Sequence, residues 1–389
     1  MTEKLFYTDS HMREFTATVL KCRQRKDKYE IVLNQTAFFP EGGGQYADTG
    51  LLENVRVTDV RERDGVIFHI ADSPLEVGRE VHGEIDWEER FVKMQQHTGE
   101  HIVSGLVHAR FGYHNVGFHL GSEDCTMDFN GEITKDELRE IEWEANRAVV
   151  LNLEVEVSYP SKEELESLSY RSKIEIEGQV RIVTIPGYDV CACCAPHVKK
   201  TGEIGMVKLT NVQRYKGGVR VTMLCGFRAL ADYDRKEASA KAISALLCAK
   251  EETIAEAAAH LKEEYANEKA KSAGLERRLL TYRAAEVSPE EKAVCIFEED
   301  LNGESLRILM NLVLETDRLC CAVFTGNDKD GYRYVLGSRT LDIRDLGKEM
   351  NREFRGKGGG KPEMVQGTIC AKADEVKRWF VEKARHIQS

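Results

Sequence analysis

The sequence predicts an α+β protein of several domains, and three observations support this. Short stretches that alternate apolar and polar residues, such as FTATVLKC and VRVTDV, recur through residues 1–86 and indicate β-strands. Strand-like and helical patterns are mixed over residues 87–228, and a stretch rich in Ala, Glu, Lys and Leu, without proline, covers residues 229–286. A chain of 389 residues is long enough for two to four domains with separate cores.

Each segment has a predicted structure. Residues 1–86 are expected to form a small N-terminal β-barrel, because their strands are short and separated by Gly, Asp and Asn turns. Residues 87–228 are expected to form an α+β domain. Residues 229–286 are expected to form a long helix or helical hairpin, because some apolar residues recur every seven positions, and this segment would be a linker or an oligomerisation element. Residues 287–389 return to an α/β pattern with a glycine-rich run.

One predicted helix of the second segment carries a pair of histidines. Asp86 is expected as its N-cap, with Glu89 as the capping-box partner, and Gly112 is expected to end it. His97 and His101 are one helical turn apart, so both imidazoles leave the same face. A buried pair with a purely structural role would have the same spacing, so the pair by itself does not establish a metal site.

A cysteine-rich segment nearly a hundred residues later supplies further ligands. The stretch CACCAPH lies between the strand-like RIVTIP and the turn TGEIG. Its thiol and imidazole groups are of the kind that Zn²⁺ prefers, whereas core packing rarely needs them at such a place. The sequence therefore predicts a Zn²⁺ site formed by His97, His101, Cys193 and His197.

Two other motifs overlap these residues. The stretch from His97 to His101 has the spacing H-x-x-E-H of inverted zinc peptidases, in which Glu100 would be the general base and a downstream glutamate such as Glu175 or Glu177 the third ligand. CACC also contains a C-x-x-C spacing, but a proline and a β-like run follow it, which disfavours a redox pair. The choice of Cys193 over Cys191 or Cys194 as the ligand rests on spacing alone.

Four segments between residues 36 and 205 resemble one family. TAFFPEGGGQYADTG, HTGEH, FHLGSEDCTMDF and CCAPHVKKTGEIG are similar, in this order, to the signature segments of the editing domain of alanyl-tRNA synthetase and of its free-standing AlaX relatives. In that family H-x-x-x-H and C-x-x-x-H motifs bind the metal, and they match the four ligands named above. The family's usual CGGTH is CCAPH here, which keeps both ligand positions and adds the thiol of Cys194.

The resemblance implies a function and a set of site residues. It implies a hydrolase that removes the wrong amino acid from tRNA(Ala), with Ser-tRNA(Ala) as the main substrate and Gly-tRNA(Ala) as a second candidate. Thr36 would hydrogen-bond the serine hydroxyl, Gln45 would contact the substrate, and His119 would face the aminoacyl end. Glu100 and His119 are the candidate catalytic residues. A zinc peptidase and a catalytically silent tRNA-binding module are the alternatives.

The chain begins at the predicted barrel, so the sequence is expected to lack the ATP-dependent catalytic domain of a synthetase and not to charge tRNA. We expect a cytoplasmic protein, because there is no signal-peptide pattern or apolar run of membrane-spanning length, and because eleven scattered cysteines fit a reducing compartment. A homodimer through the helical segment or the C-terminal domain is a further expectation.

The net charge of −11 argues against a general nucleic-acid coating protein, so any RNA contact has to be local. The second glycine run is not a P-loop, because a proline follows its last lysine, but glycines flanked by lysines can approach phosphates closely. The run also resembles the glycine-rich motif of the C-terminal domain of alanyl-tRNA synthetases. The predicted tRNA contacts are Lys199, Lys200, Arg352, Arg355, Lys357, Gly358, Gly359, Gly360 and Lys361.

Overall fold

The structure is a computed structural model that describes residues 1–122, 124–172 and 179–387. The chain divides into two compact units, Met1–Ala242 and Ile243–Ser389, and the division falls inside the helical segment predicted for residues 229–286. The fold combines several sheets with helices, as the predicted α+β multidomain class requires.

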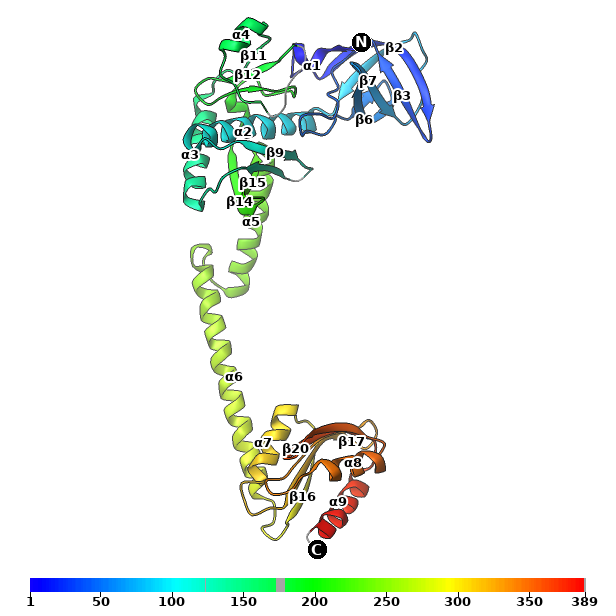
Figure 1. The fold of residues 1–389 in the computed structure, drawn as a ribbon, viewed down its shortest axis with the longest axis vertical. Helices are drawn as coiled ribbons and strands as arrows, with labels where there is room; N and C mark the ends of the chain where they lie inside the picture. Colours follow the sequence, from blue (N-terminus) through cyan, green and yellow to red (C-terminus); the bar gives the residue numbers. More distant parts are fainter. Residues whose placement is uncertain (123, 173–178, 388–389) are drawn as a thin grey trace. The chain divides into compact units, whose positions relative to one another are not determined.

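The first unit begins with a closed six-stranded barrel, where the sequence predicted one (Figure 1). Alternation places every second side chain inside it; in β7, for example, Ile67, His69 and Ala71 are buried. His69 is therefore a polar residue in an otherwise apolar interior. The barrel strands, in their spatial order, are β2 (Glu14–Arg25), β3 (Lys28–Leu33), β7 (Val66–Ala71), β6 (Val55–Arg63), β5 (Gly50–Leu52) and β8 (Glu80–Ile85); outside the barrel, β1 (Glu3–Lys4) pairs with β4 (Gln35–Thr36), and α1 (Leu5–Thr8) follows β1.

Helix α2 (Trp87–Phe111) starts after Asp86 and ends at Gly112, whose φ of 69° is left-handed, as predicted. The predicted capping box is wrong, because the Asp86 side chain makes no bond to the first turn of the helix. Its carboxylate instead accepts hydrogen bonds from Thr49 and from Arg56, whose Nη1 lies 3.0 Å from Oδ1. The guanidinium of Arg56, on β6, thus binds the carboxylate that was expected to cap the helix.

Helix α2 is the centre of the remaining part of this unit, and every residue from Lys93 to Gly105 is buried. Two glycines allow neighbouring segments to approach closely: a Cβ on Gly99 would lie 2.4 Å from Sγ of Cys225, and one on Gly105 would lie 2.1 Å from the carbonyl oxygen of Tyr188. The surrounding elements are a four-stranded sheet of β14 (Val207–Tyr215), β15 (Gly218–Cys225), β10 (Cys125–Phe129) and β9 (Asn115–Leu120), a three-stranded sheet of β11 (Glu156–Ser158), β12 (Ile182–Ile185) and β13 (Asp189–Ala192), and the helices α3 (Lys135–Leu151), α4 (Lys162–Ser167) and η1 (Thr201–Ile204).

The predicted helical segment forms α5 (Gly226–Leu247), the short η2 (Glu251–Thr253) and α6 (Ile254–Ala285). Among the apolar residues of this segment, Leu247 and Ile254 are half-buried, whereas Leu261, Tyr265, Leu275 and Leu279 are exposed. The neighbouring Leu280 is buried in the core of the second unit. The homodimer stays a prediction.

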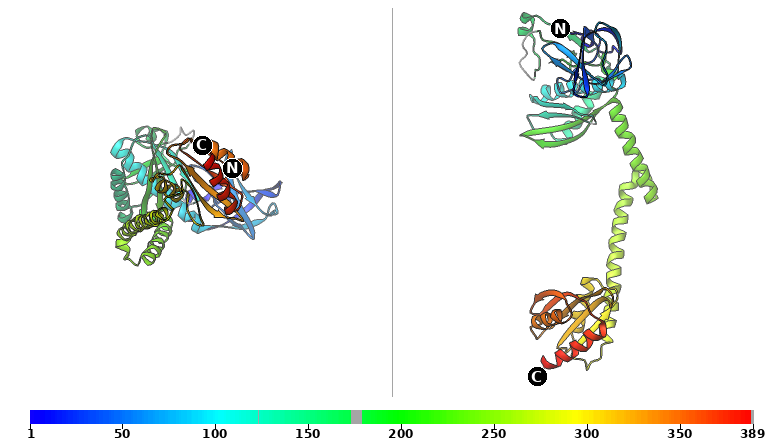
Figure 2. Two further views of the ribbon diagram at one scale, coloured as in Figure 1. Left: turned by 90° about the horizontal axis from the view of Figure 1, so that it is seen from below. Right: turned by 90° about the vertical axis from the view of Figure 1, so that its right-hand side faces the viewer.

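The second unit has a five-stranded sheet with helices on both faces (Figure 2). Along β17, Cys320 and Phe324 pack with residues of α8 and α9, whereas Cys321 and Val323 pack with residues of α6 and α7, because successive side chains point to opposite faces. No helix in the described parts of the chain is both long and apolar enough to cross a membrane. The sheet order is β16 (Ala293–Glu298), β17 (Cys320–Asn327), β18 (Gly331–Gly337), β20 (Met364–Ile369) and β19 (Lys357–Lys361), and the helices are α7 (Gly303–Val313), α8 (Arg344–Glu353) and α9 (Ala373–Ile387).

Candidate metal centre

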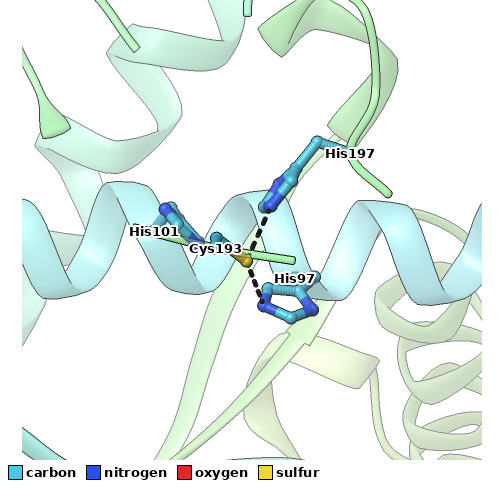
Figure 3. A group of neighbouring side chains, drawn as sticks. All are labelled: His97, His101, Cys193 and His197. Atoms are coloured by element: carbon cyan, nitrogen blue, oxygen red, sulfur yellow. Dashed lines mark hydrogen bonds between the residues drawn. The ribbon is translucent and has the colours of Figure 1, made fainter. Parts of the chain in front are cut away.

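Four side chains from α2 and from the segment after β13 converge on one point (Figure 3). His97 and His101 come from successive turns of α2, and Cys193 and His197 come from the CACCAPH stretch. One ligand atom from each residue lies within 4.8 Å of the others. Sγ of Cys193 is 3.5 Å from Nε2 of His97 and 3.3 Å from Nε2 of His197. These four residues can therefore hold a metal ion.

The other ring nitrogen of each histidine has a partner that orients the ring. Nδ1–H of His97 donates to Oε1 of Gln45 at 3.0 Å, and Nδ1–H of His101 donates to Oδ2 of Asp189 at 2.9 Å. In His197, Nδ1–H donates to Oγ1 of Thr98 at 3.1 Å. A proton on each Nδ1 leaves the Nε2 lone pair for a metal, and such outer contacts are the usual way that metal-binding histidines are held.

The Cys193 thiol is biased toward the thiolate that binds metals. Burial by itself would raise its pKa, but the neighbouring imidazole of His97 and a hydrogen bond from His101 outweigh this effect, and the pKa lies well below its usual value. Burial lowers the pKa of His197 to about 3, so this imidazole is neutral at pH 7. Both are the protonation states that ligands of a transition metal require.

Asp189 connects His101 to the half-buried guanidinium of Arg171. Its carboxylate accepts two hydrogen bonds from Arg171, Nε to Oδ1 at 2.7 Å and Nη2 to Oδ2 at 2.8 Å, besides the bond from His101. Burial alone would raise the pKa of Asp189, but His101 and Arg171 lower it overall. Neither Asp189 nor Arg171 was predicted from the sequence, because they stand 88 and 70 positions from His101 and follow no ligand spacing.

The three cysteines of the segment have different environments. Cys193 lies in the four-residue group, Cys191 is buried near His101 and Asp189, and Cys194 is exposed. Burial raises the pKa of Cys191, so its thiol stays protonated. The geometry therefore favours Cys193 as the thiolate ligand.

Glu100 lies beside this group and is held in place. Its Oε1 accepts hydrogen bonds from Oγ of Ser104 at 2.7 Å and from Nδ2 of Asn115 at 2.6 Å. Its Oε2 is 3.9 Å from Nε2 of His101, the nitrogen that faces the metal position. The carboxylate is thus next to the centre without being one of the four converging ligands.

Two of the predicted substrate residues, Gln45 and Thr36, are buried in different places. Gln45 is buried at the group, and its Nε2 has no hydrogen-bond partner among the described residues. Thr36 is fully buried, and its hydroxyl bonds Nε2 of His69 at 2.8 Å and the backbone N–H of Phe38 at 3.1 Å. The hydrogen bonds of Thr36 therefore join β4 to the barrel strand β7 and to the following segment, and they do not reach the four ligands.

His119 is exposed on β9. Its neighbour Phe118 packs on the metal group, with ring centroids of Phe118 and His97 4.8 Å apart. Because successive side chains of a strand point to opposite faces, His119 leaves the face of β9 that is turned away from His97. Phe118 was not singled out from the sequence, although it stands in the FHLG segment.

The predicted RNA contacts are all at the surface. Lys199 pairs with Asp9 at 2.9 Å, and Lys200 pairs with Glu154 at 3.0 Å. The glycine run forms β19, an exposed strand at the edge of the sheet of the second unit. No ion pair within the described residues involves the exposed basic residues around this strand, which are Arg352, Arg355, Lys357 and Lys361. The candidate peptidase ligands Glu175 and Glu177 lie outside the described residues.

The chain aligns over its full length with a known protein. The alanyl-tRNA editing protein AlaX-L of Pyrococcus horikoshii is 28% identical over 409 aligned positions, which cover 100% of both chains. The chain resembles the long-type alanyl-tRNA editing proteins from end to end. Alanyl-tRNA editing protein Aarsd1 of Rattus norvegicus is 27% identical over 380 positions, 92% of each chain. Alanine-tRNA ligase of Ignicoccus hospitalis is 30% identical over 403 positions, and the chain spans 43% of that ligase's length.

Three family models place this resemblance on the structure. The model of class II (A) tRNA synthetases matches residues 2–89, which contain the barrel. The model of the threonyl and alanyl tRNA synthetase second additional domain matches residues 180–222, which contain Cys193 and His197. The DHHA1 domain matches residues 290–387, which contain the five-stranded sheet. The similarity to editing proteins therefore extends over both units.

Proposed function

We propose that this protein is a trans-editing deacylase that hydrolyses the ester of tRNA(Ala) charged with the wrong amino acid, serine in the first place, with Zn²⁺ as its cofactor. The observation that carries the proposal is the convergence of His97, His101, Cys193 and His197, with each imidazole Nδ1 engaged and Nε2 turned inward. Mixed nitrogen and sulfur ligands at this spacing suit Zn²⁺. The full-length similarity to alanyl-tRNA editing proteins supports the substrate class.

The proposed chemistry is ester hydrolysis. When bound, Zn²⁺ supplies a Lewis acid near the ester carbonyl. A water molecule attacks the carbonyl carbon and loses a proton to a base, and the ribose hydroxyl leaves with a proton. Glu100 is the candidate base, because Oε1 is anchored by Ser104 and Asn115 while Oε2 lies next to the inward-facing nitrogen of His101.

Selectivity for serine over alanine requires groups that recognise a hydroxyl. A site that hydrogen-bonds a substrate hydroxyl discriminates against an analogue without it far better than an apolar pocket discriminates by size. Gln45 is one candidate, since its Oε1 is committed to His97 and its buried Nε2 is left to donate to a substrate oxygen. Thr36 is the second candidate, through the lone pair that remains on its oxygen. The exposed His119 would contact a part of the aminoacyl-tRNA away from the metal centre.

Binding of tRNA is assigned to local basic surfaces, since the protein as a whole is acidic. In the second unit, Lys357 and Lys361 flank an exposed edge strand that consists otherwise of glycine, so no side chain separates its backbone from a phosphate. Arg352 and Arg355 add charge nearby in the sequence. A basic edge of this kind fits an RNA backbone and carries no sequence preference of its own.

An inverted zinc peptidase is the second candidate, because of the H-x-x-E-H spacing. The position of Cys193 in the group of four favours the deacylase, since a peptidase of that type needs no thiolate. The test compares hydrolysis of Ser-tRNA(Ala), Gly-tRNA(Ala), Ala-tRNA(Ala) and an unstructured peptide by wild type, Cys193→Ser and the matched control Cys194→Ser. We expect wild type and Cys194→Ser to hydrolyse Ser-tRNA(Ala) faster than Ala-tRNA(Ala), and Cys193→Ser to lose metal and activity together.

Two results would contradict the proposal. Zinc-loaded wild type that leaves all mischarged tRNA(Ala) intact would indicate a silent tRNA-binding module. Cleavage of the peptide that depends on Glu100 but not on Cys193 would support the peptidase instead.

A further inference from the structure

A cavity of about 390 Å³ lies beside the metal centre in the first unit. Its wall combines α1 and the residues after it with β11 and with the segment that follows the cysteines. His197 belongs both to this wall and to the four converging ligands, so the cavity reaches the edge of the centre. A volume of this size is in the range of pockets that bind small organic groups.

Arg181 is a buried cation in this wall whose hydrogen-bonding capacity is not filled. It is only 8% exposed, and its Nη1 donates to the carbonyls of Cys193 at 2.8 Å and Ala195 at 3.0 Å. An arginine has five N–H donors. Nε–H has no partner among the described residues, and neither Nη2–H donates a hydrogen bond there. A buried guanidinium with donors left over is costly unless a ligand or water completes its bonds.

Two further residues of the wall suit a nucleotide. Lys199 adds a second cation that is half exposed, and the ring of Tyr7 lies 5.2 Å from the guanidinium carbon of Arg181. Asp9 is the acidic residue of the wall, and it pairs with Lys199 and accepts from the backbone N–H of His11. A half-exposed pair of this kind is weak, so a phosphate can take over the lysine at little cost.

Resting on the proposed function, we infer that this cavity holds the 3′-terminal nucleotide of the tRNA, with its 5′ phosphate on Arg181 and Lys199 and its base against Tyr7. The ester to be hydrolysed is on the ribose of that nucleotide, and the 5′ phosphate is only a few covalent bonds away. A carbonyl at the metal centre therefore brings this phosphate close to the centre, and the cavity reaches the edge of the centre at His197. Guanidinium groups bind phosphate well, and aromatic rings stack on unpaired bases.

The test uses the dinucleotide CpA, whose single phosphodiester leads to the terminal adenosine, with adenosine and inorganic phosphate as comparison ligands. Binding to the full zinc-loaded chain is measured by titration at several salt concentrations. Lys199→Ala is compared with Lys200→Ala, a matched control that removes the same charge one residue away and outside the cavity wall. Arg181→Lys is a second variant, and zinc content is checked in each because Arg181 also bonds the carbonyl of the ligand Cys193.

We expect Lys199→Ala to weaken CpA binding roughly two- to fivefold and to reduce the slope of log affinity against log salt by about 0.7, as loss of one phosphate contact predicts. Adenosine binding should change little, and Lys200→Ala should bind CpA as wild type does, because Lys200 lies outside the cavity wall and its predicted contact is with another part of the tRNA. Arg181→Lys should weaken CpA binding by about tenfold at full zinc occupancy.

Equal effects of Lys199→Ala and Lys200→Ala, or no binding of CpA by wild type at millimolar concentration, would overturn the inference. Hydrolysis of Ser-tRNA(Ala) is measured in parallel, so that the two proposals fail separately. If the protein hydrolyses Ser-tRNA(Ala) but its CpA binding does not depend on Lys199, the nucleotide site is rejected and the deacylase is kept. If CpA binding depends on Lys199 but Ser-tRNA(Ala) is not hydrolysed, the nucleotide site is kept and the deacylase is rejected.

Discussion

Replacing Thr36 by valine should destabilise the first unit by roughly 2–4 kcal/mol, because two buried partners lose a hydrogen bond at once. Nδ1–H of His69 donates to the carbonyl of Ile31 at 3.1 Å, so Nε2 of His69 accepts from the Thr36 hydroxyl. The same oxygen accepts from the N–H of Phe38. Valine has nearly the shape of threonine but neither donates nor accepts, and all of these groups are shielded from water.

Thr36→Ser is the matched control, because it keeps both hydrogen bonds and loses one methyl group, which costs about 1 kcal/mol. Urea unfolding is followed by the fluorescence of Trp87, at the start of α2, in a background where Trp143 and Trp379 are replaced by phenylalanine. A stability of Thr36→Val within about 0.5 kcal/mol of Thr36→Ser would refute the reasoning, since the buried bonds would then be worth nothing.

The same pair of variants tests the predicted role in selectivity. If the remaining lone pair of the Thr36 oxygen accepts the serine hydroxyl, Thr36→Val lowers the ratio of Ser-tRNA(Ala) to Ala-tRNA(Ala) hydrolysis by about tenfold, and Thr36→Ser leaves it unchanged. A stability loss without a change in this ratio would make Thr36 a structural residue of the barrel only.

Three further outcomes are expected. Asp189→Asn should lower zinc affinity about 10- to 100-fold in chelator competition, because the bond that orients His101 weakens, and unchanged affinity would contradict this role. Burial lowers the pKa of His69 to about 4, so below pH 6.5 the unfolded chain binds a proton at this residue that the folded chain does not bind. The free energy of unfolding should therefore fall by up to roughly 3 kcal/mol between pH 6.5 and 4, and a pH-independent stability in urea unfolding would argue against this. Alanine at both Lys357 and Lys361 should weaken tRNA(Ala) binding and reduce the salt slope by about one unit per lysine, whereas an unchanged slope would remove β19 from the RNA surface.

Local features of the chain were readable from the sequence. The helix that carries His97 and His101 begins after Asp86 and stops at Gly112, as expected, because apolar periodicity and a left-handed glycine act over a few residues. The capping box failed because Arg56, from a distant strand, takes the Asp86 carboxylate. The glycine run Gly358–Gly360 was recognised, but that it forms an edge strand depends on its pairing with β20.

The sequence by itself therefore determined the elements and the ligand types, since a spacing of four along a helix or a tight loop already places side chains together. Only the tertiary structure decided which thiol joins the histidines, which groups hold Nδ1 of each ring, and where the Thr36 hydroxyl is used. Those contacts join residues that are tens of positions apart, such as His101 and Asp189 or Thr36 and His69. Their energies depend on burial and on hydrogen-bond geometry, which no local pattern of residues records.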